Sequence, residues 1–250
     1  MFRRDIIEPY LASHPWPIVF VTVSGAHLYG FASPDSDYDL RGMHAMPAAA
    51  MLGLDHPRET HEVMDLDGEI EMDLVTHDAR KFFLMLLGKN GYVLEQIFSP
   101  LVIVNTPEFD ELRSIAARCI TRHHRHHFRS FARHQWADVI KPGKPTVKKL
   151  LYAYRPLLAG IHLMNEGRIE SNIVTLNKSF GLSYIDDLVA AKLAGSERMK
   201  AESFDLAFHE RELIRLHEVL EGASENSTLP EEQTGREALN DLLVRLRHGD

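Results

Sequence analysis

Two strings of residues, SGAHLYG at 24–30 and DSDYDLRG at 35–42, decide how the first half of the chain is expected to fold. They follow the segment 17–24, which is rich in Ile, Val, Phe and Thr and therefore predicts a buried strand. The two glycines of the first string predict a turn that opens a short helix. The second string begins as a turn and continues as a second strand over residues 38–43.

The remainder of the first hundred residues predicts a hairpin and two helices. Asp67 and Gly68 separate two strand-like stretches, a pattern that is typical of a hairpin turn. Thr76 is expected to cap the first of the two helices. The expected strands lie at 60–66 and 69–75, and the expected helices at 78–87 and 92–98.

From residue 105 onward, the spacing of apolar residues predicts helices, and strand signals almost vanish. The string KPGKP at 141–145 interrupts two of them. We expect helices at 109–136, 147–164, 184–194, 199–220 and 236–247. The sequence therefore predicts an α+β chain, with a small α/β domain at residues 1–106 and an α-helical domain at 107–250.

Composition excludes several classes of protein. Of the 250 residues, 44% are hydrophobic and 26% are charged, as in ordinary soluble globular proteins rather than disordered or collagen-like chains. The single cysteine, Cys119, excludes an intrachain disulfide and a multi-cysteine zinc site, and its apolar surroundings predict a buried structural role. No apolar run approaches the roughly 18–20 residues of a membrane helix. We therefore expect a cytoplasmic protein with no membrane contact.

Charge is distributed unevenly along the chain. The net charge of −8 argues against an indiscriminate nucleic-acid binder, yet residues 121–160 hold nine Lys or Arg and one acid. Such a basic segment is consistent with an anionic ligand, either nucleotide phosphates or an RNA or DNA backbone. It is equally consistent with a solvated helix face that is balanced by acids from elsewhere in the fold.

The string RHHRHH at 122–127 invites a zinc interpretation. His123 and His127 are four residues apart, which is a known ligand spacing on a helix. The interleaved arginines repel a cation, so the sequence favours a solvated face, or contact with phosphate or RNA, over zinc.

The acidic residues of the two regions suggest a cation site. Asp37 and Asp39 are two apart on an expected strand, so both carboxylates share one face. Such a pair is costly without a cation, and Mg²⁺ prefers carboxylate oxygens and phosphates. Glu69, Glu71 and Asp73 share one face of the second hairpin strand, and alternation alone does not choose between Glu71 and Asp73 as a third ligand. The alternatives are an acidic turn and a hairpin with one solvated face.

The glycine turn favours the functional interpretation. A strand that ends in Ser24-Gly25 and opens a helix can direct backbone N–H groups at a triphosphate. The chain has neither a Walker motif nor a Gly-x-Gly-x-x-Gly fingerprint, so dinucleotide binding has no support.

The order of these features resembles the DNA polymerase β nucleotidyltransferase superfamily. The string SGAHLYGFAS at 24–33, with the DSDYDLR run after it, is similar to one branch of predicted bacterial and phage nucleotidyltransferases that includes a group associated with RNA ligases. The resemblance covers residues 18–160, approximately. It implies a small mixed-sheet nucleotidyltransferase domain followed by an α-helical domain.

The resemblance also implies roles for individual residues. Asp37, Asp39 and Asp73 would be the catalytic carboxylates that bind Mg²⁺ or Mn²⁺, with Asp73 as the third. An NTP, with ATP as the first expectation, would be the substrate. The residues implied in nucleotide binding are Ser24, Gly25 and Ala26 of the turn, and Lys149, Tyr152 and Arg155 of a helix in the second domain.

One departure from the superfamily pattern concerns the turn. The superfamily usually has Gly-Ser where this chain has Gly25-Ala26, so a hydroxyl that could contact phosphate is missing. We expect weaker phosphate binding rather than loss of activity.

The sequence thus predicts a metal-dependent nucleotidyltransferase that transfers an NMP from an NTP to an acceptor hydroxyl, with an RNA end as a candidate acceptor. One alternative is a catalytically inactive relative that binds nucleotide or nucleic acid, which Ala26 motivates. Another is an antitoxin-like nucleotidyltransferase that modifies a partner protein. The preferred base and the oligomeric state are left open by the sequence.

Overall fold

The computed structural model describes residues 2–34, 36–65, 68–141, 145–195 and 205–248. Parts of the expected elements lie outside the described residues, namely Asp35, residues 66–67, residues 142–144 and residues 199–204. The chain divides into two compact units. The first unit consists of Met1–Gly25, Ser36–Cys119 and Gln233–Asp250, and the second of Ala26–Asp35 and Ile120–Glu232.

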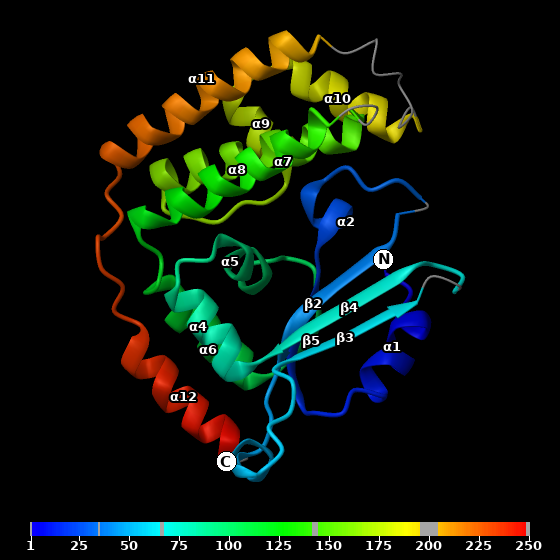
Figure 1. The fold of residues 1–250 in the computed structure, drawn as a ribbon, viewed down its shortest axis with the longest axis vertical. Coiled ribbons are helices and arrows are strands. Elements are labelled where there is room, and N and C mark those ends of the chain that lie inside the picture. The colour runs from blue at the N-terminus through cyan, green and yellow to red at the C-terminus, as the bar shows by residue number, and fades with distance from the viewer. Residues whose placement is uncertain (1, 35, 66–67, 142–144, 196–204, 249–250) are drawn as a thin grey trace. The chain divides into compact units, whose positions relative to one another are not determined.

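The first unit is built on a five-stranded sheet with the strand order β3-β4-β2-β1-β5 (Figure 1). β2 and β4 run parallel and the other neighbouring pairs are antiparallel, so the sheet is mixed. This confirms the predicted fold class. The strands are β1 (Ile18–Val23), β2 (Tyr38–His44), β3 (Thr60–Asp65), β4 (Met72–Asp78) and β5 (Val102–Asn105).

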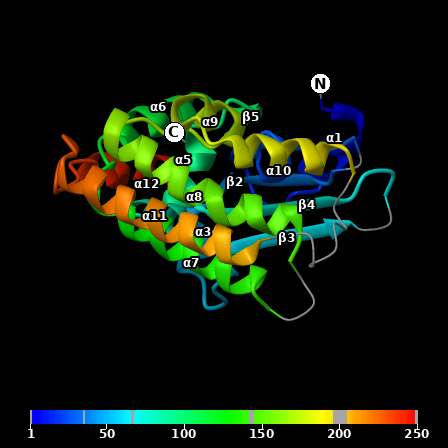
Figure 2. The same ribbon diagram turned by 90° about the horizontal axis from the view of Figure 1, so that it is seen from above.

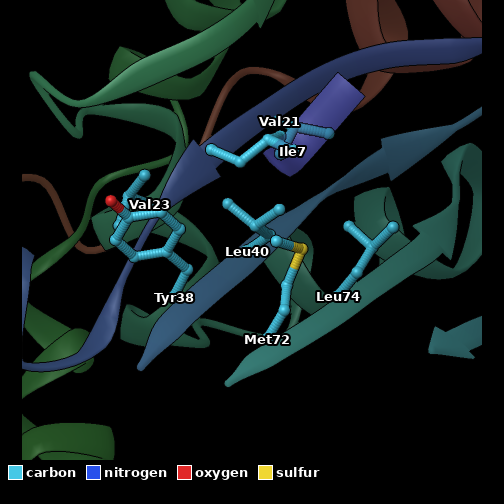
Figure 3. Close-up of a cluster of buried hydrophobic side chains, with 7 residues drawn as sticks. All are labelled: Ile7, Val21, Val23, Tyr38, Leu40, Met72 and Leu74. Carbon is cyan, nitrogen blue, oxygen red and sulfur yellow. The ribbon is translucent and has the colours of Figure 1, made fainter. Parts of the chain in front are cut away.

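One face of the sheet is covered by α1 (Arg4–Ala12), a helix that the sequence analysis did not predict. Side chains from α1 and three strands form a buried cluster there (Figure 3). Because strand residues alternate between faces, the residues of β2 and β4 that lie between the cluster members point to the opposite face. The cluster consists of Ile7, Val21, Val23, Tyr38, Leu40, Met72 and Leu74.

Helices α4 to α6 cover the opposite face. Phe20 of β1 stacks on Phe109, with 4.1 Å between ring centroids, and meets Phe82 edge to face at 5.4 Å. Since β1 is covered on both faces, its sequence is an almost uninterrupted apolar run. The helices are α4 (Ala79–Leu87), α5 (Gly91–Ile97) and α6 (Pro107–Ala117), with α12 (Arg236–His248) packed against α4 and α6 and a short α3 (Ala48–Leu52) after β2.

The hairpin and the helix after it are present, with shifted ends. Residues 72, 74, 76 and 78 of β4 are all buried, so the strand continues to Asp78. Thr76 therefore lies in the strand, and the prediction that it caps the helix is wrong. Asp78 is the cap of α4, and its carboxylate accepts a hydrogen bond from the backbone N–H of Arg80 at 3.0 Å.

The second unit is centred on α8 (Val147–Glu166), whose side chains are mostly buried. α7, α8 and α11 run alongside one another (Figures 1 and 2). The helix predicted at 109–136 is divided between α6 and α7, and α9 was not predicted. The remaining helices are η1 (Arg122–His124), α7 (Arg125–Val139), α9 (Ile173–Phe180), α10 (Ser183–Leu193) and α11 (Leu206–Glu225).

The two units do not follow the chain in simple order. α6 and α12 come after residue 106 and group with the sheet, whereas residues 26–35 come before it and group with the helices. The loop between β1 and β2 thus leaves the first unit after Gly25, through α2 (Gly25–Tyr29), and returns at Ser36.

Two expectations from composition can be compared with the structure. Cys119 is buried, and burial raises the pKa of its thiol to about 11, which agrees with a structural role. Among the helices of the described residues, none is long and apolar enough to cross a membrane.

Candidate active site

The parallel pairing of β2 and β4 brings two of the predicted carboxylates together. Asp39 and Asp73 are partners in the strand register, and their side chains share the sheet face opposite α1. Both remain accessible, with 19% and 29% of the side chain exposed. Glu71 precedes β4 and is exposed, so Asp73 is the acid that lies beside Asp39.

Asp37 lies one residue before β2, which begins at Tyr38. The prediction that both aspartates lie on the strand is therefore right only for Asp39. Asp37 is half-buried and lies at the same end of the strand.

The predicted glycine turn lies against the carboxylate of Asp39. Gly25 has a φ of +59°, and a Cβ atom there would lie 1.8 Å from Oδ2 of Asp39. The preceding residue, Ser24, donates its backbone N–H to the carbonyl oxygen of Asp39 at 2.8 Å. Only glycine fits at position 25, because a side chain would be both strained and in collision with the carboxylate.

Arg41 lies between the two carboxylates. Its Nη2 donates to Oδ1 of Asp39 at 2.9 Å and to Oδ2 of Asp73 at 2.6 Å. Burial opposes the charge of Arg41, but Tyr92, Asp39 and Asp73 together hold the pKa of its guanidinium above the ordinary value. The guanidinium therefore neutralises part of the negative charge at this end of the β2–β4 strand pair.

Tyr92 of α5 supports this arrangement. Its hydroxyl accepts a hydrogen bond from Nε of Arg41 at 2.9 Å and is also hydrogen-bonded to the side chain of Ser24. Burial raises the pKa of Tyr92, while Arg41 opposes that rise. Sequence reasoning assigned no role to Arg41 or Tyr92. Alternation from Asp39 could have placed Arg41 on the same face, whereas no local signal marks Tyr92.

The fit of a divalent cation to these residues is partial. The donors are carboxylate oxygens on one face of adjacent strands, which suits Mg²⁺ or Mn²⁺. Over the described ranges of the chain, however, no three His, Cys, Asp or Glu side chains form a ready-made metal site. The space between Asp39 and Asp73 is occupied by the guanidinium of Arg41.

The predicted nucleotide-binding residues of the helical half, like Ala26, lie in the second unit. Lys149 forms an ion pair with Asp138 at 2.7 Å. Tyr152 packs its ring edge to face against Tyr29. Arg155 is buried, and its guanidinium lies 3.8 Å from the centre of the Tyr29 ring. Tyr152 and Arg155 thus hold the segment that follows the glycine turn.

The basic segment is largely balanced within its own unit. Arg122 pairs with Glu231 at 2.9 Å, and Arg129 pairs with Glu221 at 2.8 Å. Arg125 also contacts Glu221, at 3.3 Å, and Lys141 contacts Asp138 at 3.0 Å. These contacts favour the interpretation of a helix face balanced by acids over that of an extended anion-binding surface.

The histidines of this segment do not converge. His123 lies in η1 and pairs with Glu231 at 3.2 Å, whereas His127 lies in α7 beside Phe128 and Phe131. Burial, together with the nearby Arg155, lowers the pKa of His127 to about 4. The two histidines therefore lie in different surroundings, one beside a carboxylate and the other packed against aromatic rings.

Comparison with known families identifies a match over nearly the whole chain. Residues 4–245 match the model of the RlaP family, described as the RNA repair pathway DNA polymerase beta family. The match includes the glycine turn, all three predicted carboxylates and the helices of the second unit.

Individual relatives are more distant. The chain is 29% identical over 156 residues to the uncharacterized protein MJ0002 of Methanocaldococcus jannaschii, covering 62% of this chain and 63% of that protein. It is 24% identical over 172 residues to the uncharacterized protein YcgL of Bacillus subtilis, covering 66% of this chain and 63% of that protein. The chain therefore spans less than two thirds of the length of either relative.

Among solved structures, a nucleotidyltransferase-like protein from Exiguobacterium sibiricum 255-15 overlaps 89% of this chain and 73% of its own, with 13% identity and a TM-score of 0.34. This overlap is too low to identify a fold, so the family match carries the assignment.

Proposed function

Because the chain belongs to the RNA repair pathway DNA polymerase beta family, we propose that it is a metal-dependent nucleotidyltransferase. It would transfer a nucleoside monophosphate from an NTP, with ATP as the first candidate, to an acceptor hydroxyl. One observation carries this proposal. Asp39 and Asp73 lie side by side on parallel strands, and the backbone of Gly25 lies against the carboxylate of Asp39.

The chemistry is an in-line displacement at the α-phosphorus. The oxygen of the acceptor hydroxyl forms a bond to phosphorus, the bond to the pyrophosphate oxygen breaks, and the hydroxyl proton passes to a carboxylate or to solvent. Asp73 is the better-exposed carboxylate of the pair and suits the role of acceptor for that proton. A bound Mg²⁺ or Mn²⁺ would be held by Asp37, Asp39 and Asp73 and would supply charge neutralisation at the triphosphate.

The turn at Ser24, Gly25 and Ala26 is the proposed contact for the phosphates, through backbone N–H groups. Lys149, Tyr152 and Arg155 remain proposed nucleotide contacts from the second unit. The ion pair of Lys149 with Asp138 would have to exchange for such a contact, whereas the buried stacking of Arg155 on Tyr29 supports a role in positioning the turn segment.

For the acceptor we propose the 3′ hydroxyl of an RNA. The family description supports this choice. The basic segment gives weaker support for an RNA acceptor than its sequence suggested. Acids of the same unit form ion pairs with several of its arginines.

A second candidate function has its own support. A relative that binds nucleotide without turnover would explain why Arg41 already neutralises Asp39 and Asp73 and why Ala26 replaces a serine. If this chain has that function, Asp39 and Asp73 would be bound to the Arg41 side chain rather than to a metal ion.

The test uses the pure protein with each α-labelled NTP, Mg²⁺ and short RNAs that end in either a 3′ hydroxyl or a 3′ deoxy group. Label on the hydroxyl-ended RNA alone, lost in Asp39→Asn and retained in Glu71→Gln, would support the proposal. Label on protein would favour the protein-modifying alternative. Absence of label, with NTP binding measured by calorimetry, would favour the binding protein.

A further inference from the structure

An apolar segment lies at the surface of the first unit, between β2 and β3. Residues 48–54 form α3 and the turn that follows it, and none of them has a polar side chain. No residue of α3 is buried, and Leu52 and Leu54 are 85% and 105% exposed. A single exposed leucine is common on a protein surface, whereas a run of apolar residues there marks a contact site. We call residues 48–54 the apolar tip.

The same unit has an apolar groove between α4 and α12, with a volume of about 560 Å³. Phe83 and Leu239 of its lining are buried, whereas Leu84 is 48% exposed. Covering this lining with another apolar surface would remove it from water, which is favourable. The groove is therefore a second candidate contact surface. Its apolar lining consists of Phe83, Leu84, Leu87, Leu239 and Leu243.

The charges beside the tip and the groove are complementary. Asp55 directly follows the tip, and Arg236 lies at the rim of the groove, and both are exposed. Within the described part of the chain, neither has an ion-pair partner, whereas the other arginine of the rim, Arg80, pairs with Glu59 at 3.5 Å. A tip that enters such a groove can thus bring a carboxylate to an available guanidinium.

The tip and the groove lie near the two ends of one helix. Nη1 of Arg247, at the C-terminal end of α12, donates to the carbonyl oxygen of Met46 at 2.6 Å, two residues before α3 begins (Figure 1). The N-terminal half of α12 lines the groove. With 13 residues, α12 is about 20 Å long. A two-fold axis beside this helix can therefore place the tip of each copy at the groove of the other, so that each contact occurs twice and assembly stops at two copies.

We propose that the chain forms a two-fold dimer in which the apolar tip of each copy occupies the α4–α12 groove of the other. Leu52 and Leu54 fill the groove, and Asp55 pairs with Arg236 of the partner subunit. A second copy is the occupant that fits best, because one chain carries both halves of the matched contact. This inference goes beyond the proposed nucleotidyltransferase function and does not depend on it.

Sedimentation velocity over a range of protein concentrations tests the dimer. Wild type is expected to sediment as a dimer. Leu54→Ser should raise the dissociation constant of the dimer by at least about a hundredfold, because the substitution removes a buried leucine from both copies. The matched control is Leu193→Ser in α10, which removes a leucine that is 50% exposed and should leave the dissociation constant unchanged. Circular dichroism verifies that each variant is folded.

Reversal of the paired charges tests which surfaces meet. Arg236→Glu places two carboxylates together in each of the two contacts, and should raise the dissociation constant by about tenfold. Adding Asp55→Arg to the same chain should restore the dimer, because the pair is then formed with its charges exchanged. A double variant that dimerises no better than Arg236→Glu would contradict the pairing.

Cross-linking supplies a direct measure of contact. Cys119 is buried and its thiol pKa is raised to about 11, so a bismaleimide reagent reacts with introduced cysteines instead. A mixture of Leu54→Cys and Leu84→Cys chains should give a cross-linked pair that contains one of each, whereas a mixture of Leu54→Cys and Leu193→Cys chains should not.

Three outcomes would overturn the inference. A wild type that is monomeric at every concentration would leave the tip and the groove to other partners, including lipid vesicles if the tip bound them. A dimer that Leu54→Ser does not weaken would use another surface. Cross-linking of Leu54→Cys to Leu193→Cys as efficient as that to Leu84→Cys would show that the tip has no specific place on the partner subunit.

Discussion

Two arginines lie at opposite ends of the same strand pair and differ in what they neutralise. At one end, Arg41 is shared between Asp39 and Asp73, which are register partners in β2 and β4. At the other end, Arg247 of α12 forms two bonds with a single carboxylate, that of Asp78, at 2.7 and 2.5 Å, and also donates to the carbonyl oxygen of Met46. At the first end one guanidinium is therefore shared by two carboxylates, whereas at the second, the balanced end, one guanidinium pairs with one carboxylate.

The two ends also differ in access to solvent. Asp78 is fully buried and accepts further bonds from the backbone N–H groups of Met46 and Arg80. Asp39 and Asp73 retain 19% and 29% exposure. A buried ion pair whose charges match and whose hydrogen bonds are already made can only support the fold. An accessible pair of carboxylates can take a ligand, and this difference in access distinguishes a structural ion pair from a candidate site.

The largest effect on stability is expected at the balanced end. Arg247→Ala leaves the buried carboxylate of Asp78 without its counter-ion, and should lower the free energy of unfolding by about 3–5 kcal/mol. Urea denaturation followed by circular dichroism measures this loss. The control is Arg245→Ala, whose partner Glu111 is exposed, and which should cost about 1 kcal/mol or less. Equal losses in the two variants would contradict the contrast between buried and exposed pairs.

At the end of the strand pair that holds Asp39 and Asp73, a substitution is expected to reduce activity rather than stability. Asp39→Asn keeps the shape of the side chain and removes one negative charge, so transfer of label to RNA should fall by about 10³-fold, as for loss of a group that positions transition-state charge. The free energy of unfolding should change little, because Arg41 keeps its bonds to Asp73. Glu71→Gln, at an exposed acid two residues from Asp73, should retain activity. A comparable fall in Glu71→Gln would move the site from Asp73 to the start of the hairpin strand.

The parts of this contrast that the sequence could predict are local. Alternation placed Asp39 and Asp73 on strand faces, and the glycine turn was recognised from the order of residues around Gly25. Alternation alone left the choice between Glu71 and Asp73 open, and the resemblance implied Asp73. The register of β2 on β4, which neither strand shows by itself, places Asp73 beside Asp39.

The supporting residues lie far away along the chain. Tyr92 is separated from Arg41 by 51 residues, and Arg247 from Asp78 by 169. No periodicity or turn signal links such positions, so the sequence could suggest the carboxylates and could not show what neutralises them. For the same reason Thr76 was predicted as the helix cap, although the burial of Asp78 extends the strand past it.

Acid should weaken the balanced end of the strand pair. Burial lowers the pKa of His44, the register partner of Asp78, to about 3, and that of the nearby His77 to about 4. The unfolded chain takes up protons at these histidines below about pH 6.5, while the folded protein does not. Stability is therefore full above that pH and falls as the pH is lowered toward 4, by at most about 1.4 kcal/mol per pH unit for each histidine.

Urea denaturation at pH 7, 6 and 5 measures this slope. His44→Gln removes one of the two groups and should make the slope shallower. A wild-type stability that stays constant between pH 7 and pH 5 would show that the strand end tolerates charged histidines and is less tightly packed than its burial suggests.

A substitution at Gly25 tests whether the glycine turn belongs to the accessible end, where Asp39 and Asp73 lie. Gly25→Ala places a methyl group against Oδ2 of Asp39 and in a backbone conformation with φ of +59°. The strain should cost about 1–3 kcal/mol, and the shifted carboxylate should also lower activity. The control is Gly222→Ala in α11, where no atom lies within 4 Å of the added carbon and where alanine should stabilise the helix by up to about 1 kcal/mol. If Gly25→Ala lost stability and kept full label transfer, the contact between the turn and Asp39 would be a packing feature, and the accessible end would consist of the carboxylates and Arg41 alone.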